Sequence, residues 1–161
     1  MDTGDPARQL TLRAILLSIV LTVILAAANA YLGLFAGLTV ATAIPAAVVS
    51  MGVLRLLGRV SVLENNIVAT GASAGSSIAA GTIFTIPALV LLGQWQRFDY
   101  WWVLAIAGLG GLLGVLFSVP LRRTLIIDQK LKFPEGVATA EVLKVSADPG
   151  SGLKVLGLAA A

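Results

Sequence analysis

The sequence predicts an all-α, polytopic transmembrane helix bundle with four spans, the start of a fifth and a cytoplasmic N-terminus. Of the 161 residues, 58% are hydrophobic and only 12% are charged, and the mean hydropathy is +0.96. Soluble globular chains carry about 25% charged residues. The apolar residues also lie in runs long enough to cross a hydrocarbon core of about 30 Å. Because backbone groups in lipid must be paired internally, runs of this length favour helices over strands.

The apolar runs divide the chain into four regions. Residues 1–12 are expected to form a cytoplasmic tail, and residues 13–121 a transmembrane bundle. The expected spans lie at about 14–34, 38–57, 67–92 and 101–121. Residues 122–152 form an amphipathic segment, which we expect at the cytoplasmic face. Residues 153–161 begin another apolar run, and from this we expect a truncated fifth span and an N-terminal fragment of a longer protein.

Basic residues cluster at alternate ends of these spans, and the loops at the opposite ends carry only Arg97. The clustered residues are Arg8, Arg13, Arg55, Arg59, Arg122, Arg123, Lys130 and Lys132. Cytoplasmic loops are enriched in lysine and arginine. The pattern therefore places the N-terminus and the ends of the even-numbered spans in the cytoplasm.

The composition also argues against several classes of function. Cysteine and histidine are absent, which removes thiolate metal sites, cysteine nucleophiles and the commonest general base. We therefore predict no catalytic residue, no cofactor and no metal site, and do not expect an enzyme. A net charge of +3 is modest and matches loop charge better than a nucleic-acid-binding surface.

The third expected span is unusually rich in small and hydroxyl residues. Polar side chains at membrane depth tend to face a bundle interior or a water-filled path, and glycine and proline interruptions mark helices that break near the midplane. We predict helix breaks at Pro45 and Pro87 and a substrate or ion path along this span. The predicted path residues are Glu64, Asn65, Asn66, Thr70, Ser73, Gly75, Ser76, Ser77 and Gly81. The alternative is a tightly packed central helix whose hydroxyls bond to its own carbonyls.

Glu64 has two interpretations of its own. It could accept a proton or contact a substrate amine, or it could be an acidic residue at a helix start, where the dipole favours it. Asn29 and Tyr31 are expected to bond across helices. Small residues spaced four apart predict close helix packing. These pairs are Gly33 and Gly37, Gly71 and Gly75, Ser77 and Gly81, and Gly110 and Gly114.

Three segments resemble, in order, segments of the oligopeptide transporter (OPT) family. The first is NAYLGLFAGLT from Asn29, running on to IPA at residues 44–46. The second is ENNIVATGASAG from Glu64, followed by FTIPA at residues 84–88. The third is LKFPEGVATA from Leu131. The resemblance covers about residues 13–144 and is greatest to the bacterial branch, which is related to the yellow-stripe-like metal-chelate carriers.

The resemblance implies the N-terminal part of a secondary active, proton-coupled importer of small oligopeptides, a multi-pass protein of the inner (plasma) membrane. The implied partners are the lipid bilayer, a small peptide or metal-chelate substrate, protons, and the remaining spans of a full-length transporter or a homo-oligomer; no nucleic acid is implied. One alternative is an importer of metal–chelate complexes, of the siderophore or nicotianamine type. A non-transporting membrane assembly subunit is the alternative of another class.

Overall fold

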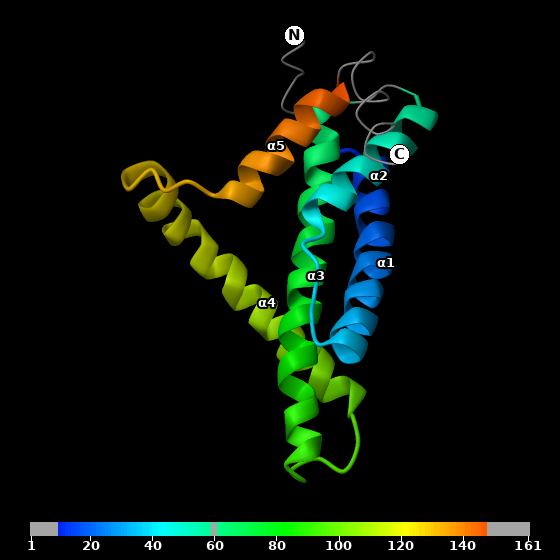
Figure 1. Ribbon diagram of the computed structural model, residues 1–161, viewed down its shortest axis with the longest axis vertical. Coiled ribbons are helices and arrows are strands. Elements are labelled where there is room, and N and C mark those ends of the chain that lie inside the picture. The colour runs from blue at the N-terminus through cyan, green and yellow to red at the C-terminus, as the bar shows by residue number, and fades with distance from the viewer. Residues whose placement is uncertain (1–9, 59–60, 148–161) are drawn as a thin grey trace. The chain divides into compact units, whose positions relative to one another are not determined.

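Helices make up all the regular structure in residues 10–58 and 61–147, which are the residues that the computed structural model describes (Figure 1). They are α1 (Leu12–Ala36), α2 (Ala43–Leu56), α3 (Val62–Leu91), α4 (Tyr100–Arg122), the π-helix η2 (Arg123–Asp128) and α5 (Pro134–Ala147). No strand occurs among these residues, so the all-α prediction is confirmed. The start of the predicted fifth span and most of the N-terminal tail lie outside the described residues.

Three helical segments are long and apolar enough to cross a membrane: α1, α3 and Tyr100–Asp128, which joins α4 to η2. The second expected span contains α2, which has 14 residues. At 1.5 Å per residue this is about 21 Å, shorter than a hydrocarbon core of about 30 Å. Four spans and a cytoplasmic N-terminus therefore stay predictions.

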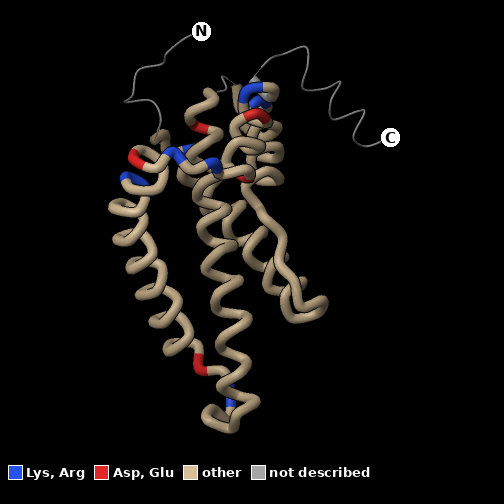
Figure 2. Tube along the Cα trace, turned by 60° about the vertical axis from the view of Figure 1, so that its left-hand side comes forward, with Lys and Arg blue, Asp and Glu red and all other residues tan. Residues whose placement is uncertain are grey.

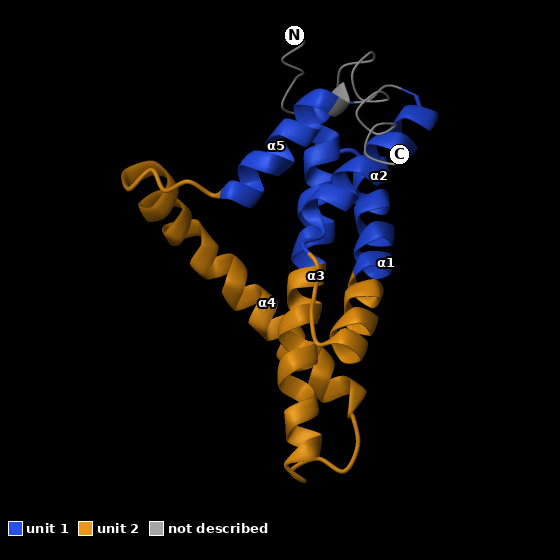
Figure 3. Cartoon of the chain, viewed as in Figure 1, with its two compact units in different colours: residues 1–25, 41–75, 134–161 blue, residues 26–40, 76–133 orange. Residues whose placement is uncertain are grey.

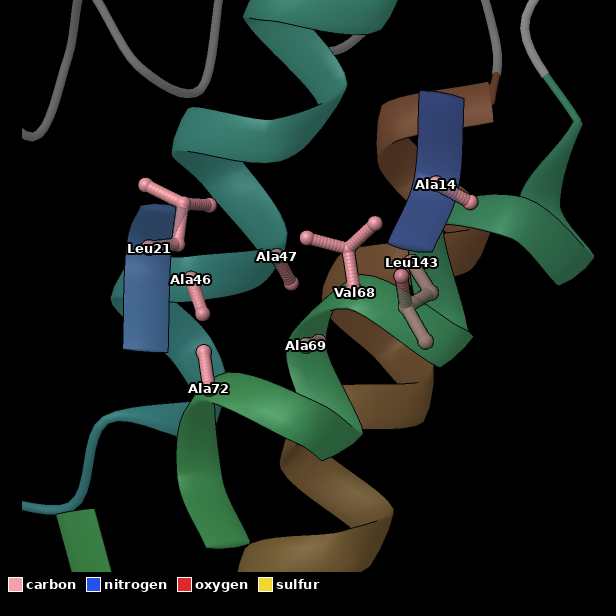
Figure 4. Close-up of a cluster of buried hydrophobic side chains, with 8 residues drawn as sticks. All are labelled: Ala14, Leu21, Ala46, Ala47, Val68, Ala69, Ala72 and Leu143. Carbon is pink, nitrogen blue, oxygen red and sulfur yellow. The ribbon is translucent and has the colours of Figure 1, made fainter. Parts of the chain in front are cut away.

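The helices divide into two compact units, each of which contains part of α1 and part of α3 (Figure 3). In the first unit (residues 1–25, 41–75 and 134–161), α1, α2, α3 and α5 share a small apolar core (Figure 4). The buried side chains are Ala14, Leu21, Ala46, Ala47, Val68, Ala69, Ala72 and Leu143. Five of the eight are alanines, and side chains this small let helix backbones approach closely.

Glycines on α3 bring it against α1 in the first unit. A Cβ added at Gly71 would overlap Ser18, and one added at Gly75 would overlap Thr22. Both glycines therefore face α1 at a distance that leaves no room for a side chain. The predicted packing role of this small-residue pair is confirmed.

In the second unit (residues 26–40 and 76–133), the close contacts differ from the predicted pairs. A Cβ at Gly33 would lie 3.1 Å from Ile83, and one at Gly111 would lie 2.9 Å from Ile78. Gly81, Gly110 and Gly114, by contrast, have no described atom within 4 Å of that position. The expectation that α4 packs through Gly110 and Gly114 was thus wrong. Instead α4 approaches α3 through Gly111, the residue after Gly110.

The chain leaves α1 through a turn at Gly37, whose φ of 70° suits glycine. The turn begins only at Gly37, because α1 continues to Ala36. Asn29, which is 3% exposed, then holds the returning segment. Its Nδ2 donates to the Val40 carbonyl at 2.9 Å, and its Oδ1 accepts from the Val40 N–H at 3.0 Å. The expectation that Asn29 bonds to another helix was wrong, and Tyr31 stacks on Phe35 in the same helix, with ring centroids 5.8 Å apart.

The prolines do not interrupt the helices in which they lie. Pro45 occupies the first turn of α2, where a missing N–H leaves no helical bond unmade. Pro87 lies inside α3, which is continuous from Val62 to Leu91. The helix breaks predicted at these two positions are therefore absent from the helical assignment. Pro134 begins α5, where its fixed φ suits the first helical position.

Replacing Gly75 with alanine should destabilise the first unit by about 1–3 kcal/mol, because the new methyl group overlaps Thr22 in a packed contact. Gly81→Ala is the matched control, since it lies in the same helix with no described atom within 4 Å. That change should be neutral, or stabilising by up to about 1 kcal/mol through helix propensity. Thermal unfolding in detergent measures both. Adding Thr22→Ala should restore much of the loss, and equal effects at the two glycines would contradict this account.

Replacing Asn29 with alanine should expose the Val40 amide to hydrogen exchange. The change leaves the N–H and the carbonyl of Val40 without the partner described above, at a cost of about 1–3 kcal/mol for each group that stays buried. Exchange followed by mass spectrometry on peptides covering residues 38–42 measures the effect. Asn66→Ala, at an exposed position of α3, should leave exchange in this segment unchanged.

Candidate functional site

Glu64 lies in the first turn of α3 and is 1% exposed, although it carries a carboxylate. An acidic residue at this position benefits from the positive end of the helix dipole. The dipole alone cannot offset the loss of hydration, because a buried charge needs a charged or hydrogen-bonding partner. Glu64 has both a charged partner and a hydrogen-bonding partner.

Arg13, at the start of α1, binds the Glu64 carboxylate through two nitrogens. Its Nη2 lies 2.8 Å from Oε2, and its Nε donates to Oε1 at 3.0 Å. Such two-point pairing is the strong form of the arginine–carboxylate contact. The Arg13 side chain is 38% exposed, so the pair joins a half-exposed cation to a buried anion. Charge is thereby neutralised where α1 and α3 both begin.

Thr11 connects the cap of α1 to the same carboxylate. Its Oγ1 accepts from the Ala14 N–H at 3.2 Å, and its hydroxyl donates to Glu64 Oε1. A threonine just before a helix, bonded to the third N–H, is an N-cap. One side chain therefore both caps α1 and supplies a third hydrogen bond to Glu64.

Asn65, the next residue of α3, binds α2. It is fully buried; its Nδ2 donates to the Ala47 carbonyl at 3.0 Å, and its Oδ1 accepts from the Ser50 hydroxyl. Consecutive residues of α3 thus hold α1 and α2 by polar contacts. We call this group, made of Thr11, Arg13, Ser50, Glu64 and Asn65, the polar node.

The other predicted path residues do not join the polar node. Ser76 is buried at 3% exposure, and no described atom pairs with its hydroxyl. The rest are exposed or half-buried, namely Asn66, Thr70, Ser73, Gly75, Ser77 and Gly81. Their assignment to a path stays a prediction.

Threonines along α3 bond to their own helix. The hydroxyls of Thr70, Thr82 and Thr85 each donate to the carbonyl four residues earlier, at 2.7, 2.9 and 2.8 Å. These bonds, together with the close contact at Gly75, match the alternative expectation of a packed central helix. The described residues contain no group of three or more carboxylates that could hold a metal ion.

Sequence reasoning missed three members of the polar node. Arg13 was counted only as loop charge, although it precedes the first span and could reach a carboxylate. Thr11 carries the usual N-cap signal, a threonine immediately before an apolar helical run. Ser50 is an isolated hydroxyl in an apolar run, which gives no indication of its partner. Asp99 caps α4 by accepting from the Trp101 N–H at 3.2 Å, a second N-cap that the sequence analysis did not identify.

Comparison with known proteins decides the family. Residues 9–161 match the family model described as OPT oligopeptide transporter protein. The chain belongs to the OPT family. A relative from Haemophilus influenzae (strain ATCC 51907 / DSM 11121 / KW20 / Rd), named "Putative oligopeptide transporter", is 48% identical over 118 residues. The match covers 72% of this OPT chain and 18% of that relative's length, and no solved structure matches the chain.

In this OPT protein, the polar node predicts that mutating Arg13 lowers stability more than mutating Glu64 does. Arg13→Gln should lower the thermal midpoint by about 5 °C or more, because it leaves the Glu64 charge buried without its main partner. Glu64→Gln should cost less, because Arg13 is half-exposed and water can solvate it. The double change should be milder than Arg13→Gln alone. Lys144→Gln, which breaks the exposed Glu141–Lys144 pair, should have little effect. Equal decreases in thermal midpoint for the Arg13 and Lys144 variants would show that the polar node does not stabilise the protein.

Proposed function

We propose that this chain is part of a secondary active transporter that imports small oligopeptides across the inner (plasma) membrane and is driven by protons. The family match over residues 9–161 carries the proposal. The three helices long and apolar enough to cross a membrane support it, as does the polar node that joins α1, α2 and α3. The relative's printed name, an oligopeptide transporter, supports peptides as the cargo.

Within this proposal, Glu64 is the residue that meets the proton or the amino group of the peptide. Its carboxylate is occupied by Arg13 and Thr11. A proton or ammonium group arriving there would compete with the guanidinium, so loading would weaken the contact between α1 and α3. Transport by alternating access requires contacts that exchange between states, and an ion pair between two helix starts is a contact of that kind.

The hydroxyls and glycines of α3 are the proposed continuation of the path. Ser76 supports this most directly, because its buried hydroxyl has no partner within the described part of the chain. An unpaired buried polar group is costly, and a peptide carbonyl or water would satisfy it. The threonines that bond to their own carbonyls are less available for such contacts.

Uptake of a radiolabelled tripeptide tests the proposal. The complete gene that encodes this chain would be expressed in a bacterial strain without its own peptide carriers. Uptake should rise with an inward pH gradient and fall with a protonophore. Glu64→Gln should abolish the stimulation by the gradient, whereas Glu141→Gln, which changes an exposed surface carboxylate, should retain it.

The outcomes separate the three functions. Uptake that ignores the protonophore would refute proton coupling. Uptake of a ferric chelate in place of the tripeptide would favour the metal–chelate importer. Transport of neither compound, with the chain firmly bound to a second transport protein in the membrane, would favour the assembly subunit. In every case, expression and thermal midpoint of the Glu64 variant are compared with those of the unaltered chain, so that unfolding is not mistaken for loss of coupling.

A further inference from the structure

A groove lies in the second unit where α4 passes into η2. Its cavity volume is about 510 Å³, within the range of small-molecule sites, about 300–1,000 Å³. The walls are apolar side chains of α4, of η2 and of the segment that follows. They are Val119, Leu121, Leu125, Ile126 and Phe133. Two polar residues complete the lining, Ser118 and Arg122, and the Ser118 hydroxyl already donates to the Val115 carbonyl at 2.8 Å.

The length of α4 places this groove at the edge of the hydrocarbon. The helix has 23 residues, about 35 Å at 1.5 Å per residue, against about 30 Å for the core. It opens with Tyr100, Trp101 and Trp102, aromatics of the kind that sit at a membrane interface. With this end at one interface, Arg122 falls at the other. The groove therefore extends from acyl-chain depth to headgroup depth.

The charge around the groove is positive. Figure 2 shows blue segments gathered at the end of α4 and in the chain that follows it, with a red segment among them. Residues 122–132 contain four basic side chains and one acidic side chain, Asp128. Among the described residues, no carboxylate lies within ion-pair distance of Arg122. The one cation in the groove lining is thus available to an external anion.

The backbone beside the groove has two uncommon features, a π-helix and a positive φ at Lys130. η2 is a π-helix, a form that is rare and frequent at functional sites. The Gln129 N–H donates to the Thr124 carbonyl and the Leu131 N–H to the Leu125 carbonyl, both at 3.0 Å. Lys130 takes a positive φ of 49°, which is uncommon for a residue with a side chain. This turn returns the chain so that Phe133 completes the groove.

We propose that the groove binds an anionic phospholipid, with its phosphate on Arg122 and part of an acyl chain against the apolar walls. Basic sites at the cytoplasmic ends of transmembrane helices recognise such headgroups, and an arginine fork matches phosphate geometry. Apolar walls at headgroup depth, beside a guanidinium that no described carboxylate pairs with, are complementary to both parts of a lipid. The site is separate from the polar node, and the proposal does not rest on the transport of peptides.

Native mass spectrometry of the full chain, released from detergent micelles, tests this inference. The probes are phosphatidylglycerol and phosphatidylcholine with identical acyl chains, titrated separately. We expect one phosphatidylglycerol per chain to bind in clear preference to phosphatidylcholine. Arg122→Gln should reduce that preference about fivefold, the effect of losing one basic residue near an anionic headgroup. Arg122→Lys should keep most of it, and Arg97→Gln, in the loop before α4, should keep all of it.

A second pair of variants tests the apolar walls. Val119→Trp fills the groove and should weaken binding of both lipids at least about fivefold. Val115→Trp, at an exposed position one turn earlier on α4, should leave binding unchanged. Helicity and monodispersity of each variant are checked against the unaltered chain. Equal binding of the two lipids, equal losses at Arg97 and Arg122, or no effect of Val119→Trp would each overturn the proposal. None of these results depends on uptake, so a failed transport assay leaves this test intact.

Discussion

A buried carboxylate at the start of α3 governs the arrangement of the first unit. Glu64 is almost fully enclosed, and an isolated charge in such surroundings would be strongly unfavourable. Arg13 and Thr11 neutralise and bond it, which fixes the start of α1 against the start of α3. Because Asn65 holds α2 in the same turn, the three helices are oriented by two consecutive residues. The apolar core around them is made mostly of alanines and could not by itself impose one register.

Small residues on α3 allow the close approach of α1 and α3 that the polar node requires. Helices joined by short hydrogen bonds must approach closely, and Gly71 and Gly75 remove the side chains that would prevent this. Association in lipid gains little from the hydrophobic effect and relies on packing and polar contacts. The polar node and the glycine contact are thus complementary parts of one interface between α1 and α3. In the second unit, α4 contains no buried residue, so its apolar surface is available to lipid or to further protein.

The two kinds of contact between α1 and α3 differ in how easily they can open. A contact made by packed glycines is difficult to open, whereas an ion pair can exchange partners with a proton or a charged substrate. The ion pair lies at the starts of α1 and α3, and the packed contact lies further along the same helices. Under the transport function proposed above, movement about the packed contact would follow a change at Glu64. The groove beside η2, which we propose binds a lipid, is made of other residues, all of them in the second unit.

Composition and patterning were sufficient for the class of the protein and for much of its local structure. The apolar runs of α1, α3 and α4, the acidic residue at the start of α3 and the Gly71–Gly75 contact all follow from one-dimensional signals, and so does the family. The length of α2 did not follow, because Thr39 to Thr42 belong to the same apolar run as the helix but lie outside it. The helix break predicted at Pro45 was wrong because a proline in the first turn of a helix costs no hydrogen bond. The break predicted at Pro87 was wrong because α3 continues through that residue. The partners of Glu64, Asn65 and Asn29 were decided only by the tertiary structure, since hydrogen bonds between residues 11 to 53 positions apart depend on how helices dock and leave no periodic trace in the sequence.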